Sequence, residues 1–175
     1  MTIDRVSWGY RRNAGINDFL TMHELITKIA ETVSCGRNIL IDVEPAVDGT
    51  IPPVMEEHIR QLGDWLGVNG EAIYASKPWR YQNDTAAGVC YTSKKVAEVG
   101  TTVYAIALNW PTTGVLSLSV VESTKETAVS MLSYAGGTFE WKNREADGIY
   151  IFVPQIPPDK LPSTWAWVFK LENLA

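Results

Sequence analysis

The stretch Asn38-Ile39-Leu40-Ile41-Asp42-Val43 decides the interpretation of the first part of the chain. It is a short apolar run rich in β-branched residues, which is typical of a buried parallel strand. Upstream, Thr21-Met22-His23-Glu24 has the pattern of a capping box, in which a threonine hydroxyl and a glutamate bond the first free backbone N–H groups of a helix. Apolar residues at helical spacing follow, and Gly36 predicts the end of that helix.

A second helix is predicted downstream of this run. Pro45 and the pair Asp48-Gly49 indicate a loop, and Pro52-Pro53 is typical of a helix start. The helix should end at Gly67 or Gly70. The order helix, strand, loop, helix is one unit of an α/β fold, but a single strand cannot close a barrel. Residues 1–80 are therefore expected to be the incomplete end of a larger α/β domain.

The remaining residues, 81–175, have the pattern of an all-β domain. Glycine, proline and polar turns separate short β-branched and aromatic runs. The predicted strands are 89–93, 102–109, 115–121, 127–132, 138–141, 149–153 and 164–171. Their regular spacing favours an antiparallel β-sandwich.

Composition excludes several functional classes. The chain has 175 residues, of which 46% are hydrophobic and 20% charged, as expected of a folded globular protein. The net charge of -5 and the scattered lysines and arginines make nucleic acid an unexpected partner, because phosphate binding needs clustered positive charge. No apolar run is long enough to span a membrane. The first residues also lack the apolar core of a signal peptide.

Histidine and cysteine do not indicate a metal centre. His23 and His58 fall on separate predicted helices, where helix packing or the surface is expected. Cys35 and Cys90 have no metal-site spacing, and they do not require a disulfide. The sequence therefore predicts no metal and no cofactor.

Four blocks of the chain resemble the alpha-L-fucosidases, in the order and spacing of that family. They are Ser7-Trp8-Gly9-Tyr10-Arg11-Arg12-Asn13, Val33-Ser34-Cys35-Gly36-Arg37-Asn38-Ile39-Leu40-Ile41, Pro45-Ala46-Val47-Asp48-Gly49-Thr50-Ile51 and Gly63-Asp64-Trp65-Leu66-Gly67-Val68-Asn69-Gly70-Glu71-Ala72-Ile73-Tyr74-Ala75-Ser76-Lys77-Pro78-Trp79. Shorter matches continue to Leu161-Pro162, so the resemblance covers essentially the whole chain.

The resemblance implies a retaining glycosidase that removes terminal fucose from glycoproteins and glycolipids. It implies the C-terminal end of a (β/α)8-like barrel followed by an antiparallel β-sandwich. Fucosylated glycans would be the substrate of the full-length parent, and a lysosomal or secreted location would follow. In that setting the sequon Asn83-Asp84-Thr85 predicts glycosylation at Asn83. Homo-oligomerisation stays open.

Retaining hydrolysis needs two carboxyl groups roughly 5–5.5 Å apart. In the family both come from segments that would precede Met1, so no catalytic residue is expected within this chain. The resemblance places Trp8, Tyr10 and Asn38 near the substrate. The alternative for the first motif is that Trp8 packs in the barrel while Arg11 and the next arginine pair with acids of the loop.

Asp42 and Glu44 form the one candidate pair of carboxylates within the chain. At positions i and i+2 they share a strand face, roughly 7 Å apart, which is closer to inverting geometry. The competing interpretation is two solvated carboxylates at a strand exit. Family members usually have asparagine where this chain has Asp42 and glycine where it has Arg37 and Glu44. These departures lie at the active-site end of the expected last barrel strand, so they put the packing of that loop and the activity of the enzyme in question.

Trp165 and Trp167 alternate on the last predicted strand, so both are expected on one side, either as a sugar-stacking platform or as core. Three hypotheses for function remain. The chain is a fragment of a fucosidase and is inactive alone, or it is a non-catalytic carbohydrate-binding or structural β-sandwich module, or it is a divergent inactive paralogue.

Overall fold

The computed structural model describes residues 1–96 and 100–175. Two α-helices precede the strands: α1 (Met22–Ser34) and α2 (Pro53–Asn69). The predicted capping box of α1 is confirmed, because the Thr21 hydroxyl accepts from the backbone N–H of Glu24 and the Glu24 carboxylate accepts from that of Thr21. The predicted start of α2 at its proline pair and its end before Gly70 are also confirmed.

The strands form two antiparallel sheets. The five-stranded sheet has the order β1-β2-β3-β8-β5, and the three-stranded sheet has the order β4-β7-β6. The bounds are β1 (Lys77–Asp84), β2 (Val89–Val96), β3 (Gly100–Ala107), β4 (Val115–Leu118), β5 (Ser123–Met131), β6 (Trp141–Asn143), β7 (Ile149–Phe152) and β8 (Trp167–Leu174). The β-sandwich is confirmed.

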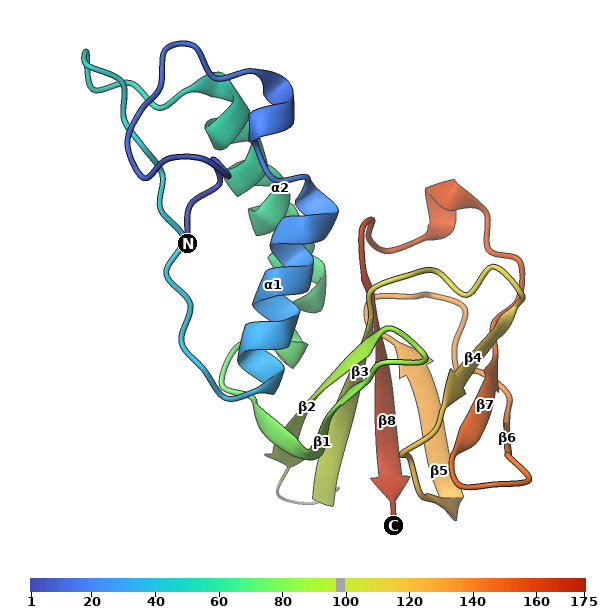
Figure 1. The fold of residues 1–175 in the computed structure, drawn as a ribbon. Helices are drawn as coiled ribbons and strands as arrows, with labels where there is room; N and C mark the ends of the chain where they lie inside the picture. The colour runs from blue at the N-terminus through green and yellow to red at the C-terminus, as the bar shows by residue number, and fades with distance from the viewer. Residues whose placement is uncertain (97–99) are drawn as a thin grey trace.

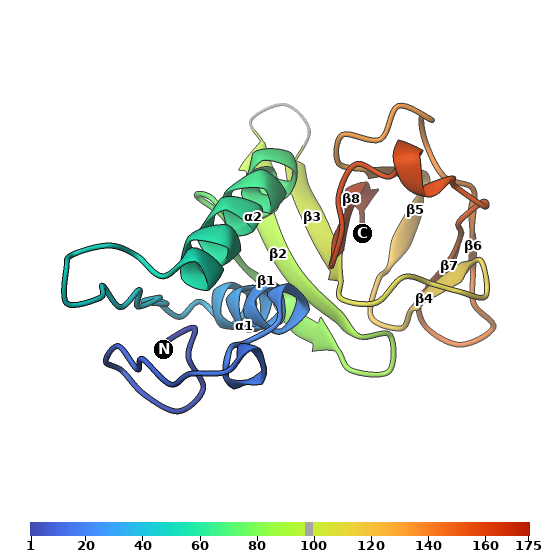
Figure 2. The same ribbon diagram turned by 90° about the horizontal axis from the view of Figure 1, so that it is seen from above.

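The molecule has three layers: the helices, the five-stranded sheet and the three-stranded sheet. Figures 1 and 2 show α1 and α2 on one face of the larger sheet and β4, β6 and β7 on the other. Strand β3 is therefore buried on both faces. Its side chains Val103 and Ala105 enter the core between the sheets, whereas Tyr104 and Ile106 enter the core beneath the helices.

Polar contacts also join the helices to the larger sheet. The indole N–H of buried Trp65 in α2 donates to the carbonyl of Ala166 at 3.0 Å. The Thr92 hydroxyl donates to the carbonyl of Ala72 at 2.7 Å, and the Tyr104 hydroxyl donates to Glu71 at 2.8 Å. These contacts fix the position of α2 on the sheet, because a buried polar group left without a partner is costly.

The predicted strand at residues 38–43 does not form, which corrects the sequence analysis. The segment is extended and has one isolated parallel bridge, between Asp42 and Thr2. The reason is the lack of neighbours, because Met1 and Thr2 are the only described residues that pair with it in this way. A strand needs a continuous ladder of backbone hydrogen bonds, and Leu40 is left largely exposed.

Two further differences lie in the sandwich. Strand β1 was not predicted because it is an exposed edge strand that carries Pro78 and lacks apolar alternation. The expectation that Trp165 and Trp167 face one side is wrong. Trp165 has a left-handed backbone (φ 69°) and precedes β8, so it packs beneath the helices while Trp167 packs against the core between the sheets.

Candidate functional site

The loop that carries the first motif, residues 7–13, is called the motif loop below. Its backbone is held by Asp4, whose side chain is buried. One carboxylate oxygen of Asp4 accepts from the backbone N–H groups of Val6 at 2.7 Å and Ser7 at 3.2 Å. The guanidinium of Arg11 donates to both carboxylate oxygens, at 2.9 and 3.0 Å. Asp4 was missed in the sequence analysis, although aspartate favours turns because its carboxylate can accept from the backbone N–H two residues on, as it does here from Val6.

A second acid, Asp18, also bonds Arg11, and the three side chains together form a clamp that holds the loop. Arg11 also donates to Asp18 at 3.0 Å, and the backbone N–H of Gly15 donates to the same carboxylate oxygen at 3.0 Å. The bond from Gly15, followed by that from Arg11, lowers the pKa of Asp18. The predicted pairing with loop acids is thus confirmed for Arg11, whereas no ion pair forms to Arg12 within the described residues.

The base of the loop is tied to helix α1. Arg5 forms an ion pair with Glu24, and its Nε donates to the carbonyl of Phe19 at 3.2 Å. The hydrogen bond from Arg5, together with those from Thr21, lowers the pKa of Glu24 to about 2. The loop is therefore attached to the first turn of α1 by charge-assisted bonds.

Trp8 and Tyr10 project from this clamped loop. Trp8 is 62% exposed and Tyr10 is 41% exposed. Neither belongs to a hydrophobic cluster of the described residues. Two large aromatic side chains are thus held outward on a loop whose backbone is fixed, which suits contact with a ligand or with further polypeptide.

Beside this loop lies a cavity of about 160 Å³. Its walls include Tyr10, Arg11, Arg12 and Glu44. Glu44 is only 3% exposed; one carboxylate oxygen accepts from the Thr2 hydroxyl at 2.8 Å, and the other has no partner among the described residues. The interpretation of Glu44 as a solvated carboxylate is therefore wrong, because its side chain is buried and bonded to Thr2.

Asn38 is not brought together with Trp8 and Tyr10. It follows the C-terminal end of α1, close to Gly36, whose position adjoins Pro78 of β1. The motif loop precedes the N-terminal end of the same helix, and 13 helical residues span about 20 Å. A substrate contact by Asn38 stays a prediction.

The remaining predicted residues take structural positions. His23 bonds the carbonyl of Leu108 at 2.8 Å, and His58 bonds the carbonyls of Val54 and Leu20, so both histidines hold helices in place as expected. Asn83 is exposed near the end of β1. Neighbouring Asp84 is buried and accepts from Ser119. No group of three or more possible metal ligands occurs in the described part of the chain.

Comparison with known proteins covers both parts of the chain. Residues 1–71 match the family profile of the alpha-L-fucosidases, and residues 82–172 match the profile of the alpha-L-fucosidase C-terminal domain. An alpha-L-fucosidase of Branchiostoma floridae and the human plasma alpha-L-fucosidase are each 47% identical over 99% of the chain. The human tissue alpha-L-fucosidase is 43% identical. The chain spans 38%, 37% and 36% of the length of these relatives, respectively.

Solved structures agree with this result. The Thermotoga maritima alpha-fucosidase in complex with fucose is 26% identical, with a TM-score of 0.77 over 98% of this chain and 38% of that chain. The same enzyme in complex with a mechanism-based inhibitor gives the same TM-score. An alpha-L-fucosidase from Paenibacillus thiaminolyticus is 22% identical with a TM-score of 0.78, which supports the fold alone. No helix among the described residues is long and apolar enough to cross a membrane.

Proposed function

The chain belongs to the alpha-L-fucosidase family, and we propose that it is the C-terminal part of an enzyme that hydrolyses terminal alpha-L-fucose from glycoproteins and glycolipids with retention. The observation that carries this proposal is the 47% identity to alpha-L-fucosidases over 99% of the chain. Fucosylated glycans are then the substrate of the longer protein.

The chain alone is expected to be inactive. Retention requires a carboxylate that attacks the anomeric carbon and a second carboxyl group roughly 5–5.5 Å away that acts as acid and base. The family resemblance places both in segments that would precede Met1. Within the chain, Glu44 is buried and bonded to Thr2, so its position argues against attack on a sugar by the pair Asp42 and Glu44.

Trp8 and Tyr10 are our candidates for contact with the sugar. A pyranose ring has an apolar face of C–H groups that packs on aromatic rings. The clamp of Asp4 and Arg11 fixes the loop before any ligand arrives, which lowers the entropy lost on binding. The loop that carries them would lie at the catalytic face of a (β/α)8-like barrel. The helices α1 and α2 and the extended segment 38–43 would be the last unit of that barrel.

The sandwich has a second candidate role as a brace for the catalytic domain. The specific observation is that the face of the larger sheet beneath α1 and α2 forms one continuous hydrophobic cluster with both helices. The bonds of Trp65 to Ala166 and of Tyr104 to Glu71 add fixed polar contacts. In this role the sandwich holds the last barrel helices in place.

A lysosomal or secreted location is proposed for the longer protein, since relatives are named plasma and tissue fucosidases. Glycosylation at Asn83 is proposed with it. The side chain is exposed, and the Thr85 hydroxyl of the sequon bonds the Asn83 amide oxygen at 3.3 Å. A mass shift of the secreted protein on treatment with an amidase for N-linked glycans, absent in Asn83→Gln, would support the proposal.

The test of the main proposal uses the transcript upstream of the codon for Met1. The extended protein should hydrolyse 4-nitrophenyl alpha-L-fucoside, and proton NMR should show the alpha anomer of fucose first. An upstream frame in which the nucleophilic aspartate is replaced, with no turnover, would favour the inactive paralogue. If the nucleophilic aspartate is present but turnover is absent, restoring the usual glycines with Arg37→Gly and Glu44→Gly tests whether these two positions limit activity.

A further inference from the structure

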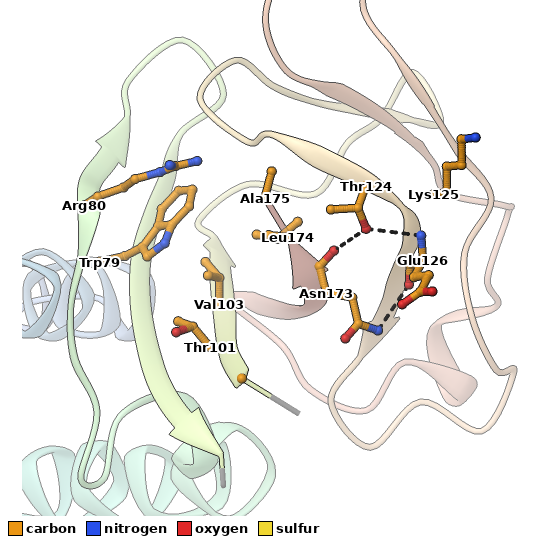
Figure 3. A pocket seen from close by; sticks show the side chains of 11 residues that line it. Trp79, Arg80, Thr101, Val103, Thr124, Lys125, Glu126, Asn173, Leu174 and Ala175 are labelled. Carbon is orange, nitrogen blue, oxygen red and sulfur yellow. Dashed lines mark hydrogen bonds between the residues drawn. The ribbon is translucent and has the colours of Figure 1, made fainter. Parts of the chain in front are cut away.

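A cavity of about 760 Å³ opens at one end of the five-stranded sheet. Figure 3 shows it between β1 on one side and β5 on the other. The described residues that line it come from that sheet and from the residue that follows β8. They are Trp79, Arg80, Gly100, Thr101, Val103, Thr124, Lys125, Glu126, Asn173, Leu174 and Ala175.

The position of this cavity follows from the unequal sizes of the two sheets. Val103 and Leu174 also contact the core between the sheets, so the cavity lies on the inner face of the larger sheet. None of its described lining residues comes from the three-stranded sheet, which has fewer strands and leaves this end uncovered. Helices α1 and α2 cover the opposite face (Figure 2), so they leave the cavity accessible.

One wall of the cavity is aromatic. Trp79 packs against buried Tyr91, with ring centroids 5.2 Å apart, and against the edge of Tyr81 at 5.5 Å. The Arg80 guanidinium lies 5.2 Å from the centroid of the Trp79 ring. The indole is therefore held by packed neighbours, and it is part of the cavity lining (Figure 3).

The opposite wall is polar and fixed by its own hydrogen bonds. Asn173 has a left-handed backbone (φ 56°), its amide donates to the carbonyl of Glu126 at 3.1 Å, and its own carbonyl accepts from the Thr124 hydroxyl at 2.7 Å. Asparagine tolerates this backbone conformation better than most residues. In the described residues nothing donates to the Asn173 amide oxygen, so that acceptor is available to a ligand.

The charges of the cavity have both signs. Arg80 lies 3.3 Å from Glu122 and is partly neutralised by it, and exposed Lys125 and Glu126 are neighbours on β5. The wall thus offers N–H donors and carboxylate and amide acceptors without a dominant charge. This pattern disfavours phosphate and other multiply charged anions, which need clustered cations.

We propose that this cavity binds a neutral pyranose sugar of a glycan, so that the sandwich carries a carbohydrate-binding site of its own. A pyranose combines an apolar C–H face with hydroxyl groups that both donate and accept, which matches Trp79 on one wall and Asn173 and Glu126 on the other. The volume falls in the usual range of small-ligand sites, roughly 300–1,000 Å³. Binding here does not require hydrolysis.

The test titrates the 175-residue chain with the methyl glycosides of L-fucose, D-galactose, D-mannose and N-acetyl-D-glucosamine. Binding is followed by the indole N–H resonance of Trp79 in proton–nitrogen correlation spectra. At least one glycoside should shift this resonance saturably, with a dissociation constant on the order of millimolar. Failure of all four to produce a saturable shift would overturn the proposal.

Two variants and a control locate the site. Thr101→Trp places a large side chain at an exposed lining position, so it should fill the cavity and weaken binding about tenfold or more without unfolding the sheet. Trp79→Ala should weaken binding similarly; because it lacks the indole, its binding is followed by the backbone N–H resonances of Thr101 and Asn173, and circular dichroism checks that it folds. Tyr74→Ala removes an aromatic ring that is 60% exposed outside the cavity, and affinity should change less than about twofold.

Unchanged binding in Thr101→Trp would overturn the location even if the wild-type chain binds a sugar. Since the titration measures binding and not turnover, its failure leaves the proposed hydrolysis untouched. Equally, a longer protein without fucosidase activity would not change the result expected for this cavity.

Discussion

The β-sandwich and the region before it differ in how they bury their apolar side chains. Between the sheets, Phe169 and its neighbours are fully enclosed by residues of both sheets. In the loops before and after α1, Val6, Ile16, Leu40 and Val47 are mostly exposed. The sandwich therefore completes its own core, whereas these loops present apolar surface that suits contact with further polypeptide or with substrate.

The same contrast appears in the polar groups. The motif loop is held by the buried carboxylate of Asp4 and its guanidinium partner Arg11, and Trp8 itself is not part of a hydrophobic cluster of the described residues. In the sandwich, the backbone is held by the hydrogen-bond ladders of the strands and by packed side chains. The loop that carries Trp8 thus relies more on charge and hydrogen bonds than the sandwich does, where order depends on apolar burial.

Truncation of a large aromatic side chain should have the largest effect and should differ between the regions. Phe169→Ala should lower the free energy of unfolding by about 3–5 kcal/mol, because it opens a cavity in the core between the sheets. Trp8→Ala is the matched change in the loop, and should alter stability by no more than about 0.5 kcal/mol. Denaturant unfolding followed by circular dichroism measures both. Equal losses of unfolding free energy in the two variants would contradict the difference between the two regions.

Much of this contrast was predictable from local patterns. The capping box of α1, the proline start of α2 and most strands of the sandwich follow from short-range rules, because caps, turns and alternation act over a few residues. The strand at 38–43 failed because a strand is defined by neighbours, and its apolar character does not supply them.

The candidate site was less predictable. Trp8 and Tyr10 were found through family resemblance, whereas the clamp that positions them depends on contacts between Asp4, Arg11 and Asp18, which only the folded loop brings together. Burial of Glu44 depends on Thr2, which is distant in sequence. The cavity beside Trp79 combines four strands, so no local pattern indicates it.

A substitution at the contact between α2 and the larger sheet should have an intermediate effect on the free energy of unfolding. Trp65→Phe keeps most of the buried ring but removes the N–H that bonds Ala166. It should cost about 1 kcal/mol, because one buried hydrogen bond is lost while the carbonyl keeps the bond from the Ser163 hydroxyl. Tyr74→Phe removes a hydroxyl from a largely exposed ring and is the control, with little change expected. If the variant Trp65→Phe is as stable as the wild type, the helices and the sheet are coupled more weakly than the structure indicates.

The smallest effect should appear as a dependence on pH at the base of the motif loop. The pKa of Glu24 is lowered to about 2, first by Arg5 and then by Thr21, so its charged form stabilises the folded state. This contribution should be full above about pH 4.5 and be lost as pH falls toward about 2. The side chain is 39% exposed, so solvent screening should keep the contribution below about 1 kcal/mol.

Comparison of wild type and Glu24→Gln across this pH range measures the contribution. The stability difference should be present at neutral pH, shrink on acidification and also shrink in high salt. A difference that grows as pH falls would contradict the assignment of Glu24 as a charged partner of Arg5.

The most direct test of the account is whether the 175-residue chain hydrolyses 4-nitrophenyl alpha-L-fucoside. The account predicts no turnover above background, since the catalytic carboxylates are expected outside these residues, while the extended protein is active under the same conditions. Fucose-specific turnover by the chain alone, abolished by Asp42→Asn or Glu44→Gln, would contradict it.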